Sequence, residues 1–339
     1  MGERFNNGSD IPTSFVSSIG ELVWPPKETN NERLKGIFPN PINDKKSLSF
    51  LLSELNNLPF LNCSRITARA LISTKVLMNF DRQNPLCHLF ETVIPLDGEV
   101  FGDYCLVYLG KNTPQRTAPS EITSQQYEKA VAIFNENHKE RKNHDFSDFE
   151  ILVIDEKMRQ DPQIQQMYYQ LYSTFGWNKK EVVALINNPN NLLVAVKDRK
   201  NGRIVSSGLV EFADINFNGM PTPLRLAEIT EAATLEEYQK RGLYNKVSDE
   251  TLRILANQPN PPHLVFGESN LDATGVLKVA ARQGRTPALE TALYFNLPYA
   301  WMLPQHVRIF QEDRPPNYSY NNLMVTYLTQ ERLKKLWRK

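Results

Sequence analysis

Residues 226–244 read LAEITEAATLEEYQKRGLY. A strand is predicted over 224–234, and a short polar turn then leads to Gly242 at the start of a helix. Such a turn presents several unpaired backbone N–H groups at the positive end of the helix dipole, which suits a phosphate. Gly242 lets the chain approach an anion closely, and Lys240 and Arg241 add positive charge. The segment is therefore a candidate phosphate-binding loop, although many helices begin in this way with nothing bound.

The sequence on both sides of this segment alternates between strand and helix patterns. Capping and turn residues mark the boundaries: Asp161-Pro162, Gly176, Asn178 with Glu181, Asn201-Gly202 and Asn218-Gly219. The predicted strands cover 149–154, 192–196, 204–212, 224–234 and 264–268, followed by a β-rich tail over 298–328. The predicted helices cover 161–175, 178–188, 243–257 and 272–283. This order predicts an α/β fold, with a mixed sheet and helices on both faces.

The first 145 residues are less clearly patterned, and no internal repeat is evident. Trp24-Pro25-Pro26 and Phe38-Pro39-Asn40-Pro41 predict extended segments. Further along, the predicted elements are a helix over 48–58, β-rich stretches over 66–80 and 89–109 with a turn at Asp97-Gly98, and a helix from Ser124. The mixed charges of 138–145 favour a solvated linker over a nucleic-acid patch. We therefore expect a smaller α+β region over 1–145, of unknown role, and the main domain over 146–339.

Composition narrows the classes of partner. The formal net charge is +1, which gives no electrostatic reason to expect nucleic acid or an anionic membrane. No run of about 18 apolar residues could span a membrane, and the N-terminus lacks the pattern of a secretory signal. Cys63, Cys87 and Cys105 match no zinc-ligand spacing, so no metal site is expected. We expect a cytoplasmic protein with reduced thiols.

Gln239-x-x-Gly242 after a strand resembles the acyl-CoA loop of the GNAT superfamily of N-acyltransferases, Gln/Arg-x-x-Gly-x-Gly/Ala. In that loop backbone amides cradle a pyrophosphate. Residues 227–238, AEITEAATLEEY, resemble in particular the β-lysine N-acetyltransferase branch. The resemblance covers slightly more than half of the chain. It implies a GNAT-like mixed, mostly antiparallel central sheet flanked by helices.

The resemblance also implies a reaction, in which an acyl group, by default acetyl, passes from acetyl-CoA or another acyl-CoA to the primary amine of a small molecule such as an amino acid. The donor-binding residues that it implies are Ala233, Thr234, Leu235, Gln239, Lys240, Arg241, Gly242, Leu243, Tyr244 and Asn270. Backbone N–H groups near 233–235 would polarise the thioester carbonyl. Tyr244 departs from the pattern, because it stands where the family has Gly or Ala.

Glu228 is the candidate general base. An ammonium must lose a proton before its lone pair can attack a thioester, and a partly buried carboxylate can accept that proton. Glu228 lies fourteen positions before Gly242, which resembles the spacing of the catalytic Glu in histone acetyltransferases. Glu228 could instead bind the substrate amine, or pair with a residue such as Arg225. Glu231 is the rival base, because GNAT strands often carry a bulge here that overrides simple alternation.

The general acid is less well marked. Asn270 and Ala273 resemble the family's Asn-x-x-Ala helix start, but Leu277 stands where many members have a Tyr acid. The candidate substitutes are Tyr244, Tyr294 and Tyr299, and a thiolate can also leave with solvent protonation alone. No cysteine lies in 147–339, so a covalent acyl-cysteine route through this domain is not expected.

Two alternatives stay open at this stage. The missing Tyr and the departure at Tyr244 would suit a catalytically weak domain that binds acyl-CoA as a sensor or regulatory module. The donor could also be an acyl carrier protein in place of CoA. The sequence leaves the acceptor, the acyl length and the oligomeric state undetermined.

Overall fold

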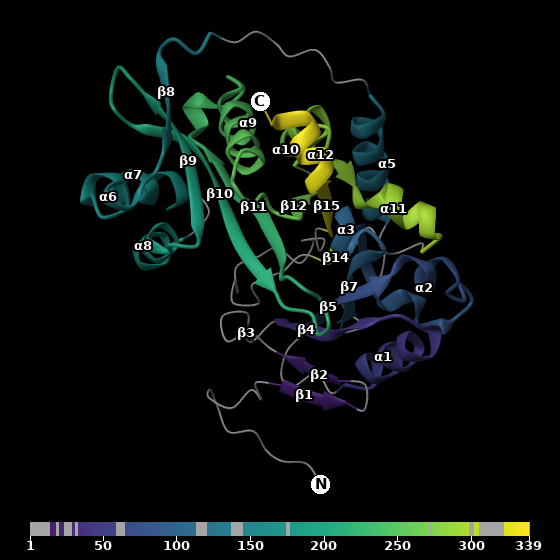
Figure 1. Cartoon of the computed structure of the whole chain (residues 1–339). Coiled ribbons are helices and arrows are strands. Elements are labelled where there is room, and N and C mark those ends of the chain that lie inside the picture. Colours follow the sequence, from purple (N-terminus) through teal and green to yellow (C-terminus); the bar gives the residue numbers. More distant parts are fainter. Residues whose placement is uncertain are drawn as a thin grey trace.

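The computed structural model describes residues 14–17, 20–23, 29–30, 33–58, 65–112, 121–136, 145–173, 177–271, 273–297, 302–304 and 322–338. Within these ranges the chain forms two β-sheets with helices packed around them (Figure 1). The predictions made for Trp24-Pro25-Pro26, most of 138–145, Gly176 and Tyr299 lie outside the described residues.

The first sheet is built by residues before position 113. Its strand order is β1-β2-β4-β5-β7-β6, with β3 paired to β4. The strands are β1 (Ser14–Ser17), β2 (Gly20–Val23), β3 (Thr29–Asn30), β4 (Arg33–Ile42), β5 (Arg65–Ser73), β6 (Phe90–Pro95) and β7 (Tyr104–Asn112). The helices are α1 (Lys45–Asn57), α2 (Thr74–Met78), the short η1 (Pro85–Leu89), α3 (Gly98–Phe101) and α5 (Glu121–Asn135). Among the described strands of this sheet, only β4 and β5 run parallel, and α1 lies between them in the chain.

The second sheet is built by residues after position 148, in the order β13-β15-β12-β11-β10-β9-β8, with β14 paired to β15. The strands are β8 (Phe149–Val153), β9 (Asn191–Asp198), β10 (Ile204–Ile215), β11 (Leu224–Thr234), β12 (Leu264–Asn270), β13 (Thr286–Pro287), β14 (Met302–Pro304) and β15 (Asn322–Thr329). Within the part of this sheet that the structure describes, only β11 and β12 are parallel. The predicted mixed, mostly antiparallel sheet flanked by helices is confirmed.

The helices of this half are α6 (Glu156–Arg159), α7 (Pro162–Tyr172), α8 (Lys179–Asn187), η3 (Glu236–Tyr238), α9 (Leu243–Ala256), α10 (Thr274–Arg282), α11 (Ala288–Phe295) and α12 (Gln330–Trp337). The predicted capping box is present, because the Glu181 backbone N–H donates to Asn178 Oδ1 over 3.0 Å and the Asn178 N–H donates to Glu181 Oε2 over 2.9 Å. α11 and α12 are helices that the sequence analysis did not predict. Asp97-Gly98, predicted as a turn within a β-rich stretch, instead begins the short helix α3.

The two sheets share a topology that their sequences do not reveal. In each, the described part of the connection between a parallel pair contains one α-helix, as in β4–α1–β5 of the first sheet and β11–α9–β12 of the second. In each, the last strand then inserts antiparallel beside the second member of the pair, as β7 does beside β5 and β15 beside β12. A strand formed earlier in the chain lies on its far side, β6 in the first sheet and β13 in the second. The sequence shows no evident internal repeat, and the shared topology is visible only in the structure.

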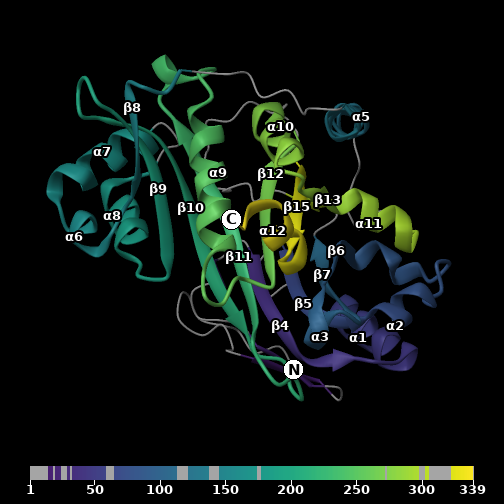
Figure 2. The ribbon, with the colours of Figure 1, turned by 45° about the horizontal axis from the view of Figure 1, so that its top comes forward.

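Helices cover one face of the second sheet. α9 lies over β10 and β11 (Figure 2). Leu252 and Leu255 of α9 and Leu333 of α12 form one cluster with Val210, Ala227, Ile229, Val265 and Leu328 of the strands. We call this the helix face. On the opposite face, α7 and α8 cover the β8–β10 side through Tyr168, Tyr172, Val182 and Ile186.

The first sheet covers the remainder of that opposite face. One apolar cluster joins Leu71, Ile94, Leu106 and Tyr108 of the first sheet to Leu226, Leu264, Phe266, Val325 and Tyr327 of the second. Ring contacts join Phe101 to His263, with centroids 5.0 Å apart, and Tyr108 to Phe266 at 6.5 Å. We call this the inter-sheet face. The boundary predicted at 145/146 falls between the two sheets and stays a prediction.

Candidate functional site

The parallel strands β11 and β12 pair over only three positions. Their register joins Leu226–Glu228 to Leu264–Phe266, whereas β11 continues to Thr234 and β12 to Asn270. Past Glu228 and Phe266, each strand therefore has an edge that the other does not pair. We call the space between these two edges the strand gap. Unpaired backbone groups along such edges can bond to an extended ligand.

The turn at Gln239–Gly242 leads from the end of β11 to the start of α9. Gly242 is the N-terminal boundary residue of α9 and has φ +77°, and Lys240 has φ +62°. No side chain caps the helix. Among the described residues, the backbone N–H groups of 240–245 have no hydrogen-bond partner, since the first helical bond is donated by Lys246. Several N–H donors therefore converge at a positive helix end, which is a geometry that binds phosphate.

The corresponding elements of the first sheet lack both features. β4 and β5 pair from Arg33–Arg65 to Ile42–Ile72, interrupted only by an irregularity after Phe38. The start of α1 is capped by Asp44, whose carboxylate accepts from the Ser47 N–H over 2.9 Å. The Asp44 carboxylate therefore already occupies the start of α1, and β4 and β5 stay paired along their length. The same topology thus occurs twice, and only the second copy carries a strand gap beside an uncapped helix.

A bulge in β11 sets the direction of the two candidate carboxylates. The register against β10 shifts between Leu209–Thr230 and Ser207–Ala233, so Glu231 and Ala232 together oppose the single residue Gly208 and β11 carries one extra residue. Glu231 has φ +49°, in the left-handed region that non-glycine residues seldom adopt. Its carbonyl accepts a 2.7 Å hydrogen bond from the Tyr172 hydroxyl of α7. The Glu231 carboxylate adds to burial in raising the pKa of Tyr172, so it lies on the α7 side of the sheet.

Glu228 stands at the point where the strands separate. It is half-buried and pairs across β11–β12 with Phe266 and across β10–β11 with Glu211. Leu226 and Phe266 belong to the inter-sheet cluster, so alternation places Glu228 on the inter-sheet face, beyond the apolar cluster. In a regular strand without the bulge, the Glu231 side chain would lie on the helix face. The bulge turns this side chain toward α7 instead. Both carboxylates therefore lie on the side of the sheet opposite α9.

The backbone of residues 233–235 divides into bonded and open groups. The Leu235 N–H donates to Val205 O over 2.9 Å, so it is already used within the sheet. Because antiparallel bonds alternate, the Ala233 N–H faces β10 and the Thr234 N–H faces the strand gap. The side chain of Gln239 follows the same edge, where its Nε2 donates to Thr234 O over 3.4 Å. Of the three predicted residues, only Thr234 thus offers its N–H to a ligand in the gap.

The basic residues of the loop differ in their surroundings. The guanidinium of Arg241 lies 5.1 Å from the ring centroid of Phe149 and 5.4 Å from that of Tyr238. Tyr238 is itself fixed, because its hydroxyl donates to Asp198 Oδ2 over 2.7 Å. Both basic residues are exposed, and the ring contacts of Arg241 tie the loop to β8.

Tyr244 turns back onto the sheet. A Cβ added to Gly208 of β10 would meet the Tyr244 ring at 3.6 Å, so the ring lies where a larger residue would exclude it. Burial raises the pKa of Tyr244, while nearby Arg285 and a hydrogen bond with Ser248 lower it. Leu277 is fully buried against Ile133 and Met324, so the family's acid position is a packing residue here.

The remaining candidates are spread out. Asn270 ends β12, and its carbonyl accepts from the Ala273 N–H over 2.9 Å, which places it at the start of α10. Tyr294 lies on α11 with 66% of its surface exposed and its ring against Phe295. Of the proposed acids, Tyr244 is the one that the structure places beside the loop and the gap.

Arg285 was missed by the sequence analysis. It follows α10, is 7% exposed, and lies on the helix face beside Gly267 of β12. Ser248 and Gln283 surround it, and the Gln283 Nε2 donates to Ser248 Oγ over 2.9 Å and to Asp249 Oδ1 over 3.0 Å. A lone Arg after a predicted helix carries no sequence signal, and only the fold brings it to the gap.

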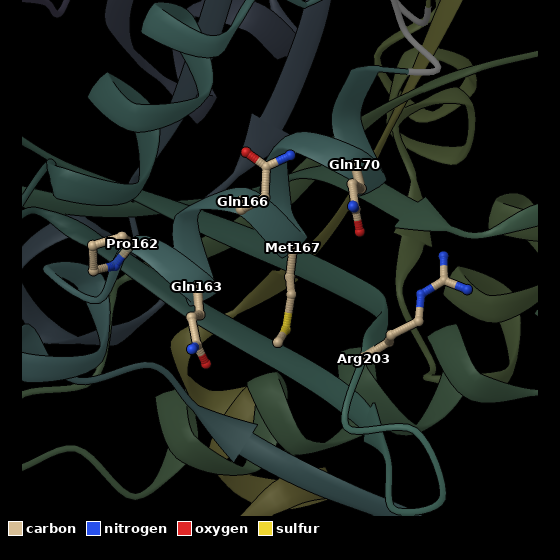
Figure 3. Close-up of a pocket in the computed structure, with 6 residues that line it drawn as sticks. All are labelled: Pro162, Gln163, Gln166, Met167, Gln170 and Arg203. Atoms are coloured by element: carbon tan, nitrogen blue, oxygen red, sulfur yellow. The ribbon is translucent and has the colours of Figure 1, made fainter.

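A separate depression lies on the outer side of α7. Its volume is about 530 Å³, and it is lined by Pro162, Gln163, Gln166, Met167, Gln170 and Arg203 (Figure 3). Arg203 forms an ion pair with Glu237 at 3.3 Å. The lining is mostly amide and apolar and includes none of the predicted site residues. It offers no acid, base or nucleophile for chemistry.

The described cysteines and potential metal ligands indicate no further site in the described part of the chain. Burial raises the pKa of Cys105 to about 12, and Cys87 is also a free thiol. No cluster of three or more His, Cys, Asp or Glu side chains suited to a metal ion occurs within the described ranges. Nor does this part of the chain contain a helix with the length and apolar character of a membrane span.

No family model and no curated protein sequence matches this chain. Among solved structures, NAA60 from Arabidopsis thaliana in complex with acetyl-CoA has a TM-score of 0.39 at 10% identity, over 54% of this chain and 99% of that one. A ribosomal-protein-S5-alanine acetyltransferase from Vibrio fischeri has a TM-score of 0.39 at 13% identity, over 59% and 100%. A spermidine N-acetyltransferase chimera from Vibrio cholerae has 0.32 at 13%, over 56% and 99%. With TM-scores below 0.5, the chemistry of this chain has to be derived from its own residues.

Proposed function

We propose that this chain is an acyl-CoA-dependent N-acyltransferase of the GNAT type. One observation carries the proposal: β11 and β12 separate after three paired positions, directly beside an uncapped helix whose first turn is reached through Gly242. A ligand with a pyrophosphate and a long amide-bearing arm matches this combination, because the helix end suits the phosphates and the strand edges suit the arm. Comparison of the two sheets supports the proposal, because the first sheet has the same topology but lacks both the strand gap and the uncapped helix start.

In this proposal the donor and the acceptor approach the reacting carbonyl from opposite faces of the second sheet. The donor lies in the strand gap with its pyrophosphate at Gln239–Gly242 on the helix side. The acceptor, a small molecule with a primary amine, approaches Glu228 from the inter-sheet side. The first sheet forms the opposite wall of that side, which gives residues 1–145 a role in holding the acceptor. This arrangement keeps donor and acceptor on opposite sides of the reacting carbonyl.

The reaction follows from this placement. Glu228 takes a proton from the ammonium, directly or through water, and the freed nitrogen lone pair attacks the thioester carbon. The Thr234 N–H, on the open edge of β11, stabilises the oxyanion of the tetrahedral intermediate. The C–S bond then breaks, and the nitrogen gives up its second proton to solvent, so that a neutral amide is released. The departing thiolate takes a proton from Tyr244, which regains one from solvent, or takes it from solvent directly. Glu231 is the second candidate base, on the α7 side of the bulge.

The test is a two-step experiment on the full chain. Calorimetry with CoA measures whether the gap and loop bind the donor, and a thiol-release assay with acyl-CoA and a panel of primary amines measures turnover. We expect both binding and turnover. CoA binding without turnover of any amine would support the alternative of a sensor or regulatory module. Turnover only with an acylated acyl carrier protein would support the alternative of a carrier-protein donor. Absence of CoA binding would reject the proposed donor site.

A further inference from the structure

The guanidinium of Arg285 lies at the closed end of the strand gap. A Cβ built on Gly267 would stand 3.1 Å from Arg285 Nη1 and 3.0 Å from Ile229 O. Gly267 and Ile229 directly follow the last paired positions, Phe266 and Glu228. The Arg285 head therefore lies on the helix face where the two strands begin to diverge, and it fits there because residue 267 has no side chain.

The charge of Arg285 is not balanced by the described residues. The side chain is 7% exposed, its Nε has no hydrogen-bond partner, and its Nη2 reaches Ser248 Oγ only at 3.4 Å. It forms no ion pair within the described ranges. Tyr244 and Asp249 are close enough to act on it, but Tyr244 is a neutral phenol and the Asp249 Oδ1 accepts from Gln283. Because buried charges are normally paired, this guanidinium calls for an anionic partner.

The position of Arg285 selects which part of a donor could supply that anion. From Thr234, beside the loop, to Ile229, beside Arg285, the strand spans five residues, which is at most about 17 Å because the bulge at Glu231 shortens it. The pantetheine arm that joins a pyrophosphate to the CoA sulfur is of comparable extended length. With the pyrophosphate at Gln239–Gly242, the acyl group comes to the closed end of the gap. The phosphates stay at the open end.

We propose that the transferred acyl group carries a carboxylate of its own, as in the CoA thioesters of dicarboxylic acids, and that Arg285 binds that carboxylate. This inference rests on the proposed function and replaces the default acetyl group with an anionic one. The planar guanidinium has several donors suited to a carboxylate, of which Nε is without a partner. The acyl carboxylate is not consumed, and the bonds made and broken are those of the transfer described above.

The test compares succinyl-CoA with acetyl-CoA in the full-length protein, with kcat/KM measured for each. We expect succinyl-CoA to be favoured by at least about 100-fold, the effect of one desolvated charge pair. Arg285→Gln should remove most of that preference. Arg282→Gln should keep it, because Arg282 lies on the last turn of α10, where its Nε donates to Lys278 O.

Stability gives a second readout. Without ligand, Arg285→Gln should leave Tm unchanged or raise it, because the variant removes an unpaired buried charge. Succinyl-CoA should then raise the Tm of the unmodified protein more than that of the variant. If the variant fails to fold, Gly267→Ala supplies an independent perturbation, since its Cβ would meet Arg285 Nη1 at 3.1 Å. We expect it to reduce the preference for succinyl-CoA as well.

Three results would overturn the inference. Equal use of both donors by the unmodified protein is the first, and an Arg285→Gln variant that loses both activities equally is the second. The third is a preference that follows a carboxylate on the amine acceptor and not on the donor. CoA binding by calorimetry separates this inference from the proposed function. If CoA binds without donor preference, only the acyl assignment fails, whereas lack of CoA binding rejects the site itself.

Discussion

Gly242→Asp places a carboxylate at the start of α9, where the loop is proposed to hold a pyrophosphate. At about 5 Å and an effective dielectric of about 20, two like charges repel by about 3 kcal/mol. Gly242 is half-buried, so solvent screening reduces this value. Even half of it, about 1.5 kcal/mol, lowers affinity about tenfold. The new side chain would also cap the helix end, as Asp44 does in α1.

Strain is the competing explanation and can be measured separately. Gly242 has φ +77°, so any side chain there costs about 1 kcal/mol of stability. Gly219 has the same φ of +77°, and a Cβ added to it meets nothing within 4 Å. Gly219→Asp is therefore a matched control that carries the strain and the charge away from the loop.

The assay is calorimetric titration of CoA into the full-length protein and both variants, with Tm measured in parallel. We expect both variants to lose similar stability, and only Gly242→Asp to lose at least tenfold in affinity. Its defect should shrink at high salt, because the screening length shortens. A dissociation constant unchanged by Gly242→Asp would refute the phosphate assignment of the loop.

Three further predictions concern the base, the architecture and one histidine. Glu228→Gln should lower kcat by roughly 10²–10³, with partial recovery at high pH and little change in CoA affinity, while Glu231→Gln should be mild; the reverse pattern would move the role to Glu231. A chain beginning at residue 146 should aggregate, because it exposes the inter-sheet cluster around Phe266. A monodisperse, folded product would instead support an independent domain that begins at residue 146. Burial lowers the pKa of His263, whose Nδ1 accepts a hydrogen bond from the Arg225 N–H. Because His263 binds a proton more readily in the unfolded chain, the stability of the protein should fall as pH drops below about 6.5. A His263→Asn variant with the same slope of Tm against pH would contradict this.

Local signals predicted the elements that hold the site. The bounds of β11 agree residue for residue with the expectation over 224–234, because an uninterrupted β pattern ends at a polar turn. Asn178 and Glu181 fixed the start of α8, since both hydrogen bonds of a capping box lie within one helical turn. The position of Gly242 at the start of a helix was also predicted, and the structure adds its φ of +77°, which Gly adopts without strain.

Features that depend on distant residues were not readable. The bulge at Glu231 was anticipated only through the family resemblance, because it arises from pairing with β10, and it changes which face the carboxylate occupies. Arg285 reaches the gap only because α10 returns the chain to β12, which no local pattern announces. The shared topology was hidden for the same reason, since the order of strands in a sheet is set by long-range pairing.

The recurrence of one strand order in both halves is what duplication of a single ancestral unit would leave behind. After such an event only one copy needs to keep an open pair of strands, and the other is free to change. In the first copy an aspartate capped the helix and the strands stayed joined. The first copy therefore lacks both features of the proposed donor site, and its sheet packs against the second one through the inter-sheet cluster. Duplication would thus leave one copy with the proposed site and the other as the wall beside it.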